Sequence, residues 1–451
     1  MNKFQKYAGA SILAAMLAGC AAYRDQPLSM KAGWPDGLSR LEVDPSKMPL
    51  AELATHAFDP ADGLDMTEVA MIAVANNPGL KLARDDAGIA SAQAFSAGLL
   101  PDPQFGFSPQ FPQNGIPGEN VTAYDLGLGY NLGALLTHSL KRSAARSDLA
   151  KADLVLLWQE WQVVGQARLL FARKVSMQHV LGILEQSREL ASLRQAREQT
   201  ALQGNDLTLA AWAADENAMQ GIDRQLIDTR RLIVKDRHAL NKLLGLAPGA
   251  RLNLVGEAGL PALDKREIEK RLSDLAGIRP DLMALQAGYK AQDMRLRQAI
   301  LAQFPAIHFG LVRARDNTGI NYEGFSLSLS LPIFNRNRGN IAVARATRRR
   351  VRDEFQIRLN QAYGDAEQIL SDQKLLETQL GQLNRDLATL SQLSSRADAA
   401  FGAGDMSLSA YCALKNSEFS KQIEKNAVME SILEERIALL TTIGGQLKEA
   451  K

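Results

Sequence analysis

The sequence predicts a mainly helical protein that also carries two pairs of β-strands and is built as two related halves. Two long stretches without proline, residues 118–247 and 333–451, mix polar and apolar residues and predict helices, because proline breaks helix interiors. Shorter runs of alternating apolar and small polar residues predict the strands. Several short motifs recur in the same order about 200 residues apart, which indicates an internal duplication.

The helical stretches carry apolar residues at spacings of three and four, which is typical of a coiled-coil seam. Simple core packing would give the same pattern, so the spacing establishes long packed helices and no more. Residues 138–203, if continuous, would span roughly 100 Å. The seam residues are Ile222, Leu226, Ile233, Leu240 and Leu243 in the first half and Ile369, Leu376, Leu380, Leu383, Leu387 and Leu390 in the second.

The predicted strands alternate with a period of two, and small polar residues occupy one face. This pattern fits strands of a membrane barrel with a wet lumen, although a half-buried strand of a soluble sandwich would look similar. Residues 104–111 and 306–315 are the predicted partner strands, joined through turn-rich segments at 114–118 and 316–319. The residues predicted to face lipid are Tyr124, Leu126, Leu128, Phe325, Leu327 and Leu329.

The repeated motifs divide the chain. Asn77-Pro78 corresponds to Arg279-Pro280, and the tract from Asp206 corresponds to the tract from Asp405. We expect a signal peptide at 1–19, a tether at 20–60, a first repeat at 61–250 and a second repeat at 251–451. Two pairs of strands per chain are too few to close a barrel, so partner chains are needed, and the residues alone leave a dimer and a trimer open.

The N-terminus resembles a bacterial lipoprotein signal. Lys3 and Lys6 precede an apolar stretch that ends at Leu17-Ala18-Gly19-Cys20, and the Cys20 thiol is the predicted lipid attachment site. The alternative is an ordinary secretory signal with an incidental cysteine. Residue 21 is Ala rather than the Asp that retains many lipoproteins at the inner membrane, so we expect sorting to the outer membrane.

Composition and spacing argue against several classes of function. Lys and Arg total 52 against 50 Asp and Glu, so global charge gives no case for nucleic-acid binding. The five His are scattered, and we find no catalytic or metal-ligating spacing, so we expect no enzyme, metal site or cofactor. One basic cluster spans residues 345–352; it is predicted either as a solvated helix face or as a contact for anionic lipid headgroups.

Taken together, the ordered repeats, the proline-initiated hairpins and the Gly-Asp-Met-Ser-Leu turn resemble the TolC family of outer-membrane efflux proteins over roughly residues 60–447. The tract Leu331 to Gly339 resembles the CzcC and CusC branch, which serves heavy-metal pumps. The resemblance implies a homotrimer with a twelve-stranded barrel in outer-membrane lipid and a long coiled-coil helical barrel in the periplasm. It also implies two partners, a periplasmic adaptor (membrane fusion protein) and an inner-membrane pump of the resistance-nodulation-division type.

In this family the helix-to-helix turns at the periplasmic tip meet the adaptor. Here the corresponding residues are Gly204, Asn205, Asp206, Gly402, Gly404 and Asp405, with the glycines expected to permit tight reversals. Family members often place gate carboxylates near positions that hold Ala410 and Ala413 here, which is a departure. Asp405 and Asp206 are the nearest gate candidates, and each could instead cap the following helix.

The function predicted from the sequence is therefore passive exit of substrates through a trimeric duct, with heavy-metal cations as the first candidate cargo. A duct for drugs or other small molecules is the alternative within this class. A periplasmic coiled-coil structural or adaptor lipoprotein is the alternative from another class.

Overall fold

The computed structural model describes residues 23–35, 43–113, 121–204, 207–260 and 264–444. The chain divides into two units, residues 1–35 and 36–451. In the first unit, the described residues 23–35 form no helix or strand. The elements of the second unit are η2 (Pro45–Lys47), α2 (Ala51–Thr55), α3 (Met66–Asn76), α4 (Pro78–Gly98), β1 (Gln104–Gln110), β2 (Ala123–Asn131), α5 (Leu132–Gln203), α6 (Leu209–Leu243), α7 (Lys265–Ser273), α8 (Leu275–Ile278), α9 (Pro280–Leu301), β3 (Ala306–Arg315), β4 (Asn321–Ser330), α10 (Arg338–Ala403) and α11 (Leu408–Ile443).

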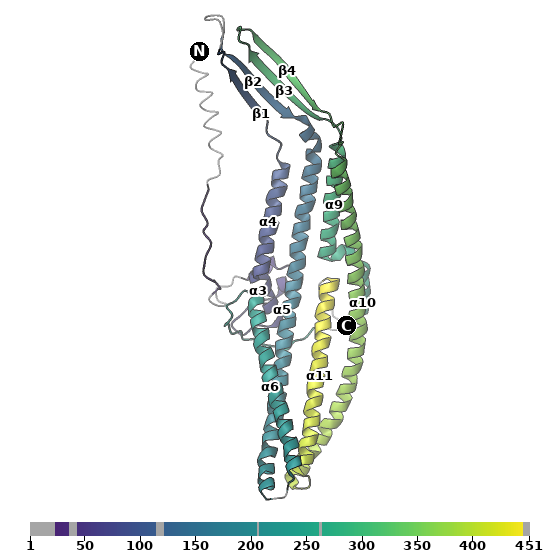
Figure 1. Cartoon of the computed structure of the whole chain (residues 1–451). Helices are drawn as coiled ribbons and strands as arrows, with labels where there is room; N and C mark the ends of the chain where they lie inside the picture. Colours follow the sequence, from purple (N-terminus) through teal and green to yellow (C-terminus); the bar gives the residue numbers. More distant parts are fainter. Residues whose placement is uncertain (1–22, 36–42, 114–120, 205–206, 261–263, 445–451) are drawn as a thin grey trace. The chain divides into compact units, whose positions relative to one another are not determined.

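The same order of elements occurs twice in the second unit (Figure 1). A helix of 21 or 22 residues leads into a β-hairpin, and a very long helix of 72 or 66 residues then leads into one of 35 or 36. The predicted combination of long helices with two hairpins is therefore confirmed. The first long helix begins at Leu132, directly after the strand, which is earlier than the predicted start at residue 138.

Both helices that precede the hairpins begin with proline. Pro78 and Pro280 occupy the first helical turn, where the missing N–H costs nothing and the fixed φ angle suits a helix. The Asn77 side chain caps α4 by accepting a hydrogen bond from the Leu80 backbone amide, and its side-chain nitrogen donates to the Leu243 carbonyl at 2.8 Å. This second bond ties the start of α4 to the end of α6.

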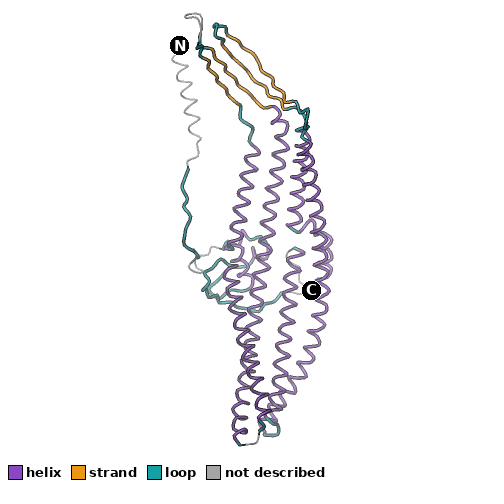
Figure 2. The backbone as a smooth tube through the Cα atoms, in the orientation of Figure 1, coloured by secondary structure: helices purple, strands orange, loops and turns teal. Residues whose placement is uncertain are grey.

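The four strands form one antiparallel sheet in the order β1-β2-β3-β4 (Figure 2). The first hairpin pairs Phe105 with Leu128, and the second pairs Leu311 with Phe325. Pairing of β2 with β3, in which Leu128 lies opposite Leu311, joins the two halves into a single sheet.

The core lies among the helices, away from the sheet. Helix α3 is its most buried element, and a capping box fixes its start: the Glu68 amide donates to Asp65 at 2.7 Å and the Asp65 amide donates to Glu68 at 3.0 Å. Met71 and Ile72 are fully buried against residues of α5 and α6, among them Phe171.

The predicted seams contribute to helix packing. Leu376, Leu380 and Leu383 of α10 pack against Val428 and Ile432 of α11. In α6, the seam residues Leu226, Leu240 and Leu243 are buried.

Polar contacts link α5 to α11 across the two halves. Arg173 donates to Glu434 at 2.6 Å and Asn426 donates to the Ser176 hydroxyl at 2.6 Å.

Within the described ranges, no helix combines the length and the apolarity required to cross a bilayer.

Candidate functional site

The sheet has two chemically different faces. Residues directly opposite in an antiparallel pair share a face, so the register assigns each side chain. All six residues predicted to face lipid fall on one face, together with their neighbours on β1 and β3. That apolar face carries Phe105, Phe107, Tyr124, Leu126, Leu128, Tyr130, Ile307, Phe309, Leu311, Phe325, Leu327 and Leu329.

The opposite face is made of glycine, serine and other small or polar residues. One row runs Gly129, Gly310, Ser326, and the next begins Asn131, His308, Ser328. The rows are close-packed, since a Cβ added at Gly310 would lie 2.5 Å from the Ser326 hydroxyl oxygen.

Little of the chain covers the apolar face. Phe325 is 75% exposed and Leu327 is 58% exposed, although Phe325 stacks on Phe309 with ring centroids 6.4 Å apart. Every residue of β1 and β4 is exposed. Exposed apolar area of this extent on a soluble monomer marks an interaction surface, so this face requires a covering environment.

The apolar face ends in charged residues at the strand ends that lie away from the helices. Arg313 lies opposite Glu323, with a nitrogen–oxygen distance of 3.5 Å. In the turn that follows, Asp316 accepts hydrogen bonds from Thr318 and from the Tyr322 hydroxyl, the latter at 2.7 Å. These bonds hold the pKa of Asp316 at about 2, so the turn carries a fixed negative charge.

The helix-to-helix turns lie at the other ends of α5 and α10, far from the sheet (Figure 1). Gly404 adopts the left-handed conformation, with φ +83°, so the glycine prediction is confirmed there. The prediction that glycine is needed for the reversal was wrong for Gly204, whose φ of −79° suits any residue. It was also wrong for Gly402, which lies inside α10. Asn205 and Asp206 lie outside the described residues, as does Cys20.

The helices after the turns are not capped by the aspartates considered from the sequence. The Thr208 hydroxyl accepts from the amide three residues on and caps α6, and the Ser407 hydroxyl does the same for α11. The capping interpretation of Asp405 was therefore wrong. Asp405 is exposed, and its amide donates to the Ala400 carbonyl at 2.9 Å.

A cluster beside the second turn joins the two halves and was not found from the sequence. The rings of Phe401 and Tyr411 stack with centroids 4.6 Å apart, and Arg197 of α5 lies 5.5 Å from the centre of the Phe401 ring. Asp398 accepts bonds from Lys415 at 3.0 Å and from the Tyr411 hydroxyl at 2.9 Å. The Lys415 bond is the main reason that the pKa of Asp398 lies below its ordinary value.

A buried thiol and a half-buried group of charged residues lie next to this cluster. Cys412 is buried, and burial raises the pKa of its thiol. Arg194 bridges Glu198 at 2.6 Å and Asp215 at 2.5 Å. Burial, followed by the hydrogen bond with Asp215, raises the pKa of Glu198.

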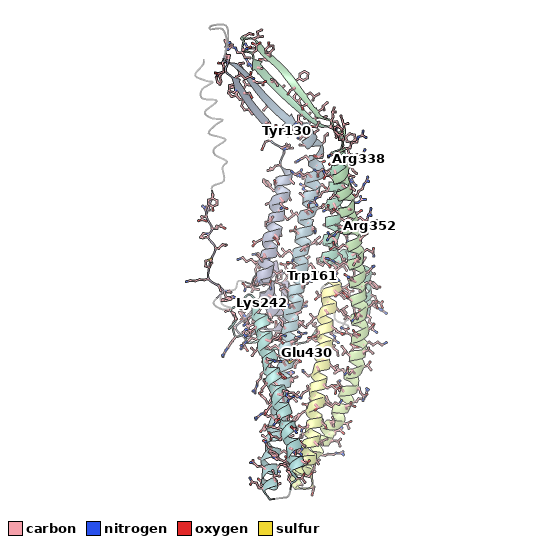
Figure 3. All side chains as sticks on the ribbon, viewed as in Figure 1. Tyr130, Trp161, Lys242, Arg338, Arg352 and Glu430 are labelled. Carbon is pink, nitrogen blue, oxygen red and sulfur yellow. The ribbon has the colours of Figure 1, made fainter. Side chains whose placement is uncertain are left out.

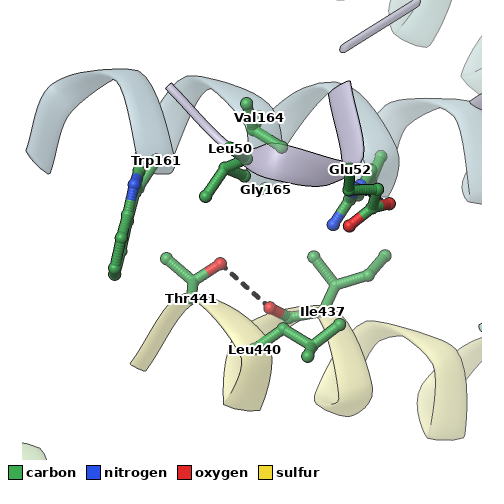
Figure 4. Close-up of a pocket in the computed structure, with 9 residues that line it drawn as sticks. Leu50, Glu52, Trp161, Val164, Gly165, Ile437, Leu440 and Thr441 are labelled. Atoms are coloured by element: carbon green, nitrogen blue, oxygen red, sulfur yellow. Dashed lines mark hydrogen bonds and ion pairs between the residues drawn. The ribbon is translucent and has the colours of Figure 1, made fainter. Parts of the chain in front are cut away.

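A small cavity lies between α2, α5 and α11 (Figure 4). It is lined by Leu50, Trp161 and Ile437 among others, and it measures about 20 Å³. That volume suits a single water molecule rather than a substrate. On its wall the Arg168 guanidinium forms an ion pair with Glu52, and the Thr441 hydroxyl donates to the Ile437 carbonyl at 2.9 Å. No group of three His, Cys, Asp or Glu residues in the described ranges is arranged to hold a metal ion.

Comparison with solved structures places this fold among outer-membrane channels. The Campylobacter jejuni outer-membrane channel CmeC superposes with a TM-score of 0.71 at 15% identity, covering 94% of this chain and 96% of that one. The Neisseria gonorrhoeae outer-membrane channel MtrE gives 0.67 at 17% identity, covering 95% and 98%. CusC, whose structures concern transmembrane channel formation, gives 0.67 at 17% identity, covering 89% and 98%.

At these identities the comparisons establish the fold. No protein-family profile matches the chain, and no curated protein matches it in sequence. The neighbours are channels rather than enzymes. The similarity extends over the whole fold, because nearly all of each aligned chain is covered.

Proposed function

We propose that this chain is the outer-membrane exit duct of a tripartite efflux system. The observation that carries the proposal is the four-stranded sheet with one apolar and one polar face, both uncovered, on helices that share the fold of outer-membrane channels. Lipid would cover the apolar face, which includes Phe325 and Leu327, and the glycine and serine face would line an aqueous pore.

The sheet also supports assembly from several copies. Its outer strands β1 and β4 pair on one side only, so each leaves a row of backbone donors and acceptors free among the described residues. In a bilayer such groups have to be satisfied by another strand. We infer a homotrimer, in which β4 of each copy pairs with β1 of the next and twelve strands close a barrel.

The long helices would then form the periplasmic part of the duct. Helix α5 has 72 residues and is about 108 Å long at 1.5 Å per residue. We infer that the turns around Gly204, Asn205 and Asp206 and around Gly402, Gly404 and Asp405 meet a periplasmic adaptor, and that an inner-membrane pump of the resistance-nodulation-division type drives transport. Asp405 and Asp206 remain the proposed gate carboxylates.

The remaining features of the proposal concern the ends and the history of the chain. We infer lipid attachment at Cys20 after removal of residues 1–19, a tether over 20–60, and a tandem duplication that produced the repeats 61–250 and 251–451. The repeated element order and the two proline-initiated helices support the duplication.

Heavy-metal cations are the proposed cargo, on the resemblance of the tract 331–339 to the CzcC and CusC branch. Growth of a deletion strain on cobalt, zinc, cadmium, copper and silver salts, beside a panel of hydrophobic drugs, tests the cargo. Selective metal sensitivity restored by the intact gene is expected, whereas drug sensitivity alone would assign the duct to drugs.

The duct itself is tested by its mass and its conductance. The full chain extracted from outer membranes should run as a trimer and should conduct ions in planar bilayers. A monomer that remains in the aqueous phase once its lipid is removed would instead support a periplasmic structural or adaptor lipoprotein.

A further inference from the structure

The helices next to the sheet carry a concentration of positive charge. Between Leu132 and its first acidic residue, Asp148, α5 holds Lys141, Arg142 and Arg146. Helix α10 holds six arginines and no acidic residue between Arg338 and Arg352. The whole chain is nearly neutral, with 52 basic and 50 acidic residues, so this local excess calls for a specific explanation.

Most of these cations have no acidic partner. Arg348 forms an ion pair with Asp293 at 2.7 Å. By contrast, six exposed arginines in these stretches form no side-chain ion pair or hydrogen bond with any residue that the structure describes, and four of them lie at matched positions on the two helices. We call these four the collar arginines: Arg142, Arg146, Arg345 and Arg349.

The collar arginines of α5 share a helix face with apolar residues. Leu132, Leu135 and Leu136 are exposed, and helical spacing places Arg142 and Arg146 on the same side about two to four turns further from the sheet. The exposed face of α5 is therefore apolar beside the sheet and cationic beyond it.

Helix α10 repeats this order. Ile333 and Phe334 precede it and are 65% and 96% exposed. The chain then passes through two left-handed residues, Arg336 and Asn337, before the helix starts. Arg338, Arg345, Arg349 and Arg352 follow at spacings of seven, four and three, which place them along one face; Figure 3 labels Arg338 at the start of the helix and Arg352 further along.

The apolar part of the sheet is shorter than a bilayer is thick, and the exposed apolar residues of the adjoining helices make up the difference. The apolar rows of β4 run from Phe325 to Leu329, about 13 Å at 3.3 Å per residue, which is short of the ~25 Å apolar band of membrane barrels. The exposed leucines of α5 and Phe334 extend that band beyond the sheet. Arg142 lies about 9 Å beyond Leu136, and a long arginine side chain can reach back to the headgroup layer.

We propose that the collar arginines bind the phosphodiester headgroups of anionic phospholipids in the periplasmic leaflet of the outer membrane. The inference rests on the proposed function, which sets the sheet in that membrane. It locates the leaflet boundary on α5 and α10 rather than at the ends of the strands. Guanidinium groups suit this role because they donate paired hydrogen bonds to phosphate oxygens.

The test uses the full chain reconstituted in vesicles of phosphatidylcholine and phosphatidylglycerol. Trimers are extracted gently, and the lipid that they retain is identified by native mass spectrometry. The collar variant is R142Q/R146Q/R345Q/R349Q. A matched control, R224Q/K235Q/K374Q/R396Q, removes the same charge from exposed residues of α6 and α10 that lie far from the sheet.

Wild type and the control should retain phosphatidylglycerol over phosphatidylcholine by about fivefold per bound headgroup, and the collar variant should lose that preference. High salt should weaken the preference in wild type. A wild-type trimer without the preference, or equal loss in the control, would overturn the collar and leave the duct intact. The collar would also be overturned if the collar variant retained as much phosphatidylglycerol as wild type but conducted ions with altered selectivity, because the arginines would then line the pore. If wild type forms no trimer in the membrane, both the duct and the collar are overturned. The mass of the extracted wild-type protein is therefore measured before its lipid, which distinguishes failure of the duct from failure of the collar alone.

Discussion

An arginine at position 327 should block assembly, whereas an arginine at position 328 should not. Leu327 lies in the middle of the apolar rows of β4, opposite Phe309, and Ser328 lies on the other face, opposite His308. Leu327 is 58% exposed in the single chain, so its replacement breaks few contacts within the protein. In water, two exposed substitutions of this kind would each change the free energy of unfolding by only about 0.5 kcal/mol or less.

A bilayer makes the two positions differ. Arginine on the lipid-facing side of a membrane barrel costs about 2–4 kcal/mol near the midplane, whereas lumen positions tolerate charge. A cost of 2 kcal/mol reduces the assembled population about 30-fold per copy, and a trimer bears it three times. Leu327→Arg should therefore leave almost no trimer in the outer-membrane fraction, and Ser328→Arg should assemble at close to the wild-type level.

The assay is quantitative blotting of unheated outer-membrane samples, with total protein measured after heating. Equal loss in both variants would show that the two faces have been assigned wrongly. Equal tolerance would show that no lipid contacts the apolar face, and the membrane placement of the sheet would then be refuted.

Two further predictions concern stability and can be measured on the purified protein. Gly245→Ala should lower the free energy of unfolding by about 2 kcal/mol or more, because φ is +64° and the new Cβ would lie 2.5 Å from the Asn76 carbonyl oxygen; Gly404→Ala, at φ +83° in open space, should cost only about 1 kcal/mol. Denaturant titration compares the two, and equal costs would contradict the steric argument. The pKa of Asp398 is lowered mainly by Lys415, so the stability it contributes is present above its unfolded pKa of 3.8 and is lost as pH falls through the lower folded value. The difference in melting temperature between wild type and Asp398→Asn should narrow on acidification below that range, and a constant difference would show that the bond contributes nothing through ionisation.

Periodicity predicted the elements because it is a local property of the chain. A period of two placed Leu327 and Ser328 on opposite faces before any register was known, and the observed pairing agrees. The absence of proline from residues 118–247 and 333–451 likewise predicted long helices, and the structure has α5, α6, α10 and α11 there. In each case the physical cause lies within a few residues of its effect.

Contacts between distant residues had no such local sign. Arg279 lies over the ring of Trp158 at 4.6 Å and pairs with Asp281 at 2.8 Å, but only the packing of α9 against α5 brings the arginine and the tryptophan together. The group formed by Asp398 and Lys415 depends in the same way on the turn between α10 and α11.

Helix caps were missed for a different reason. The tract Asp206-Leu207-Thr208 offers two favoured cap residues, and propensity does not choose between them. The choice depends on where the backbone first turns helical, and α6 begins at Leu209, directly after Thr208. The same holds for Ser407 against Asp405.

The sheet and the helices next to it constrain each other. A four-stranded sheet with two uncovered faces and two open edges cannot be stable alone in water, because it buries too little apolar area to offset the ordering of its chain. Lipid alone would cover the apolar face but would leave the edges of β1 and β4 unsatisfied, and a neighbouring copy alone would satisfy the edges but leave Phe325 and Leu327 in water. The proposed trimer in a bilayer supplies both, and under that proposal the collar arginines of α5 and α10 lie where lipid gives way to the periplasm.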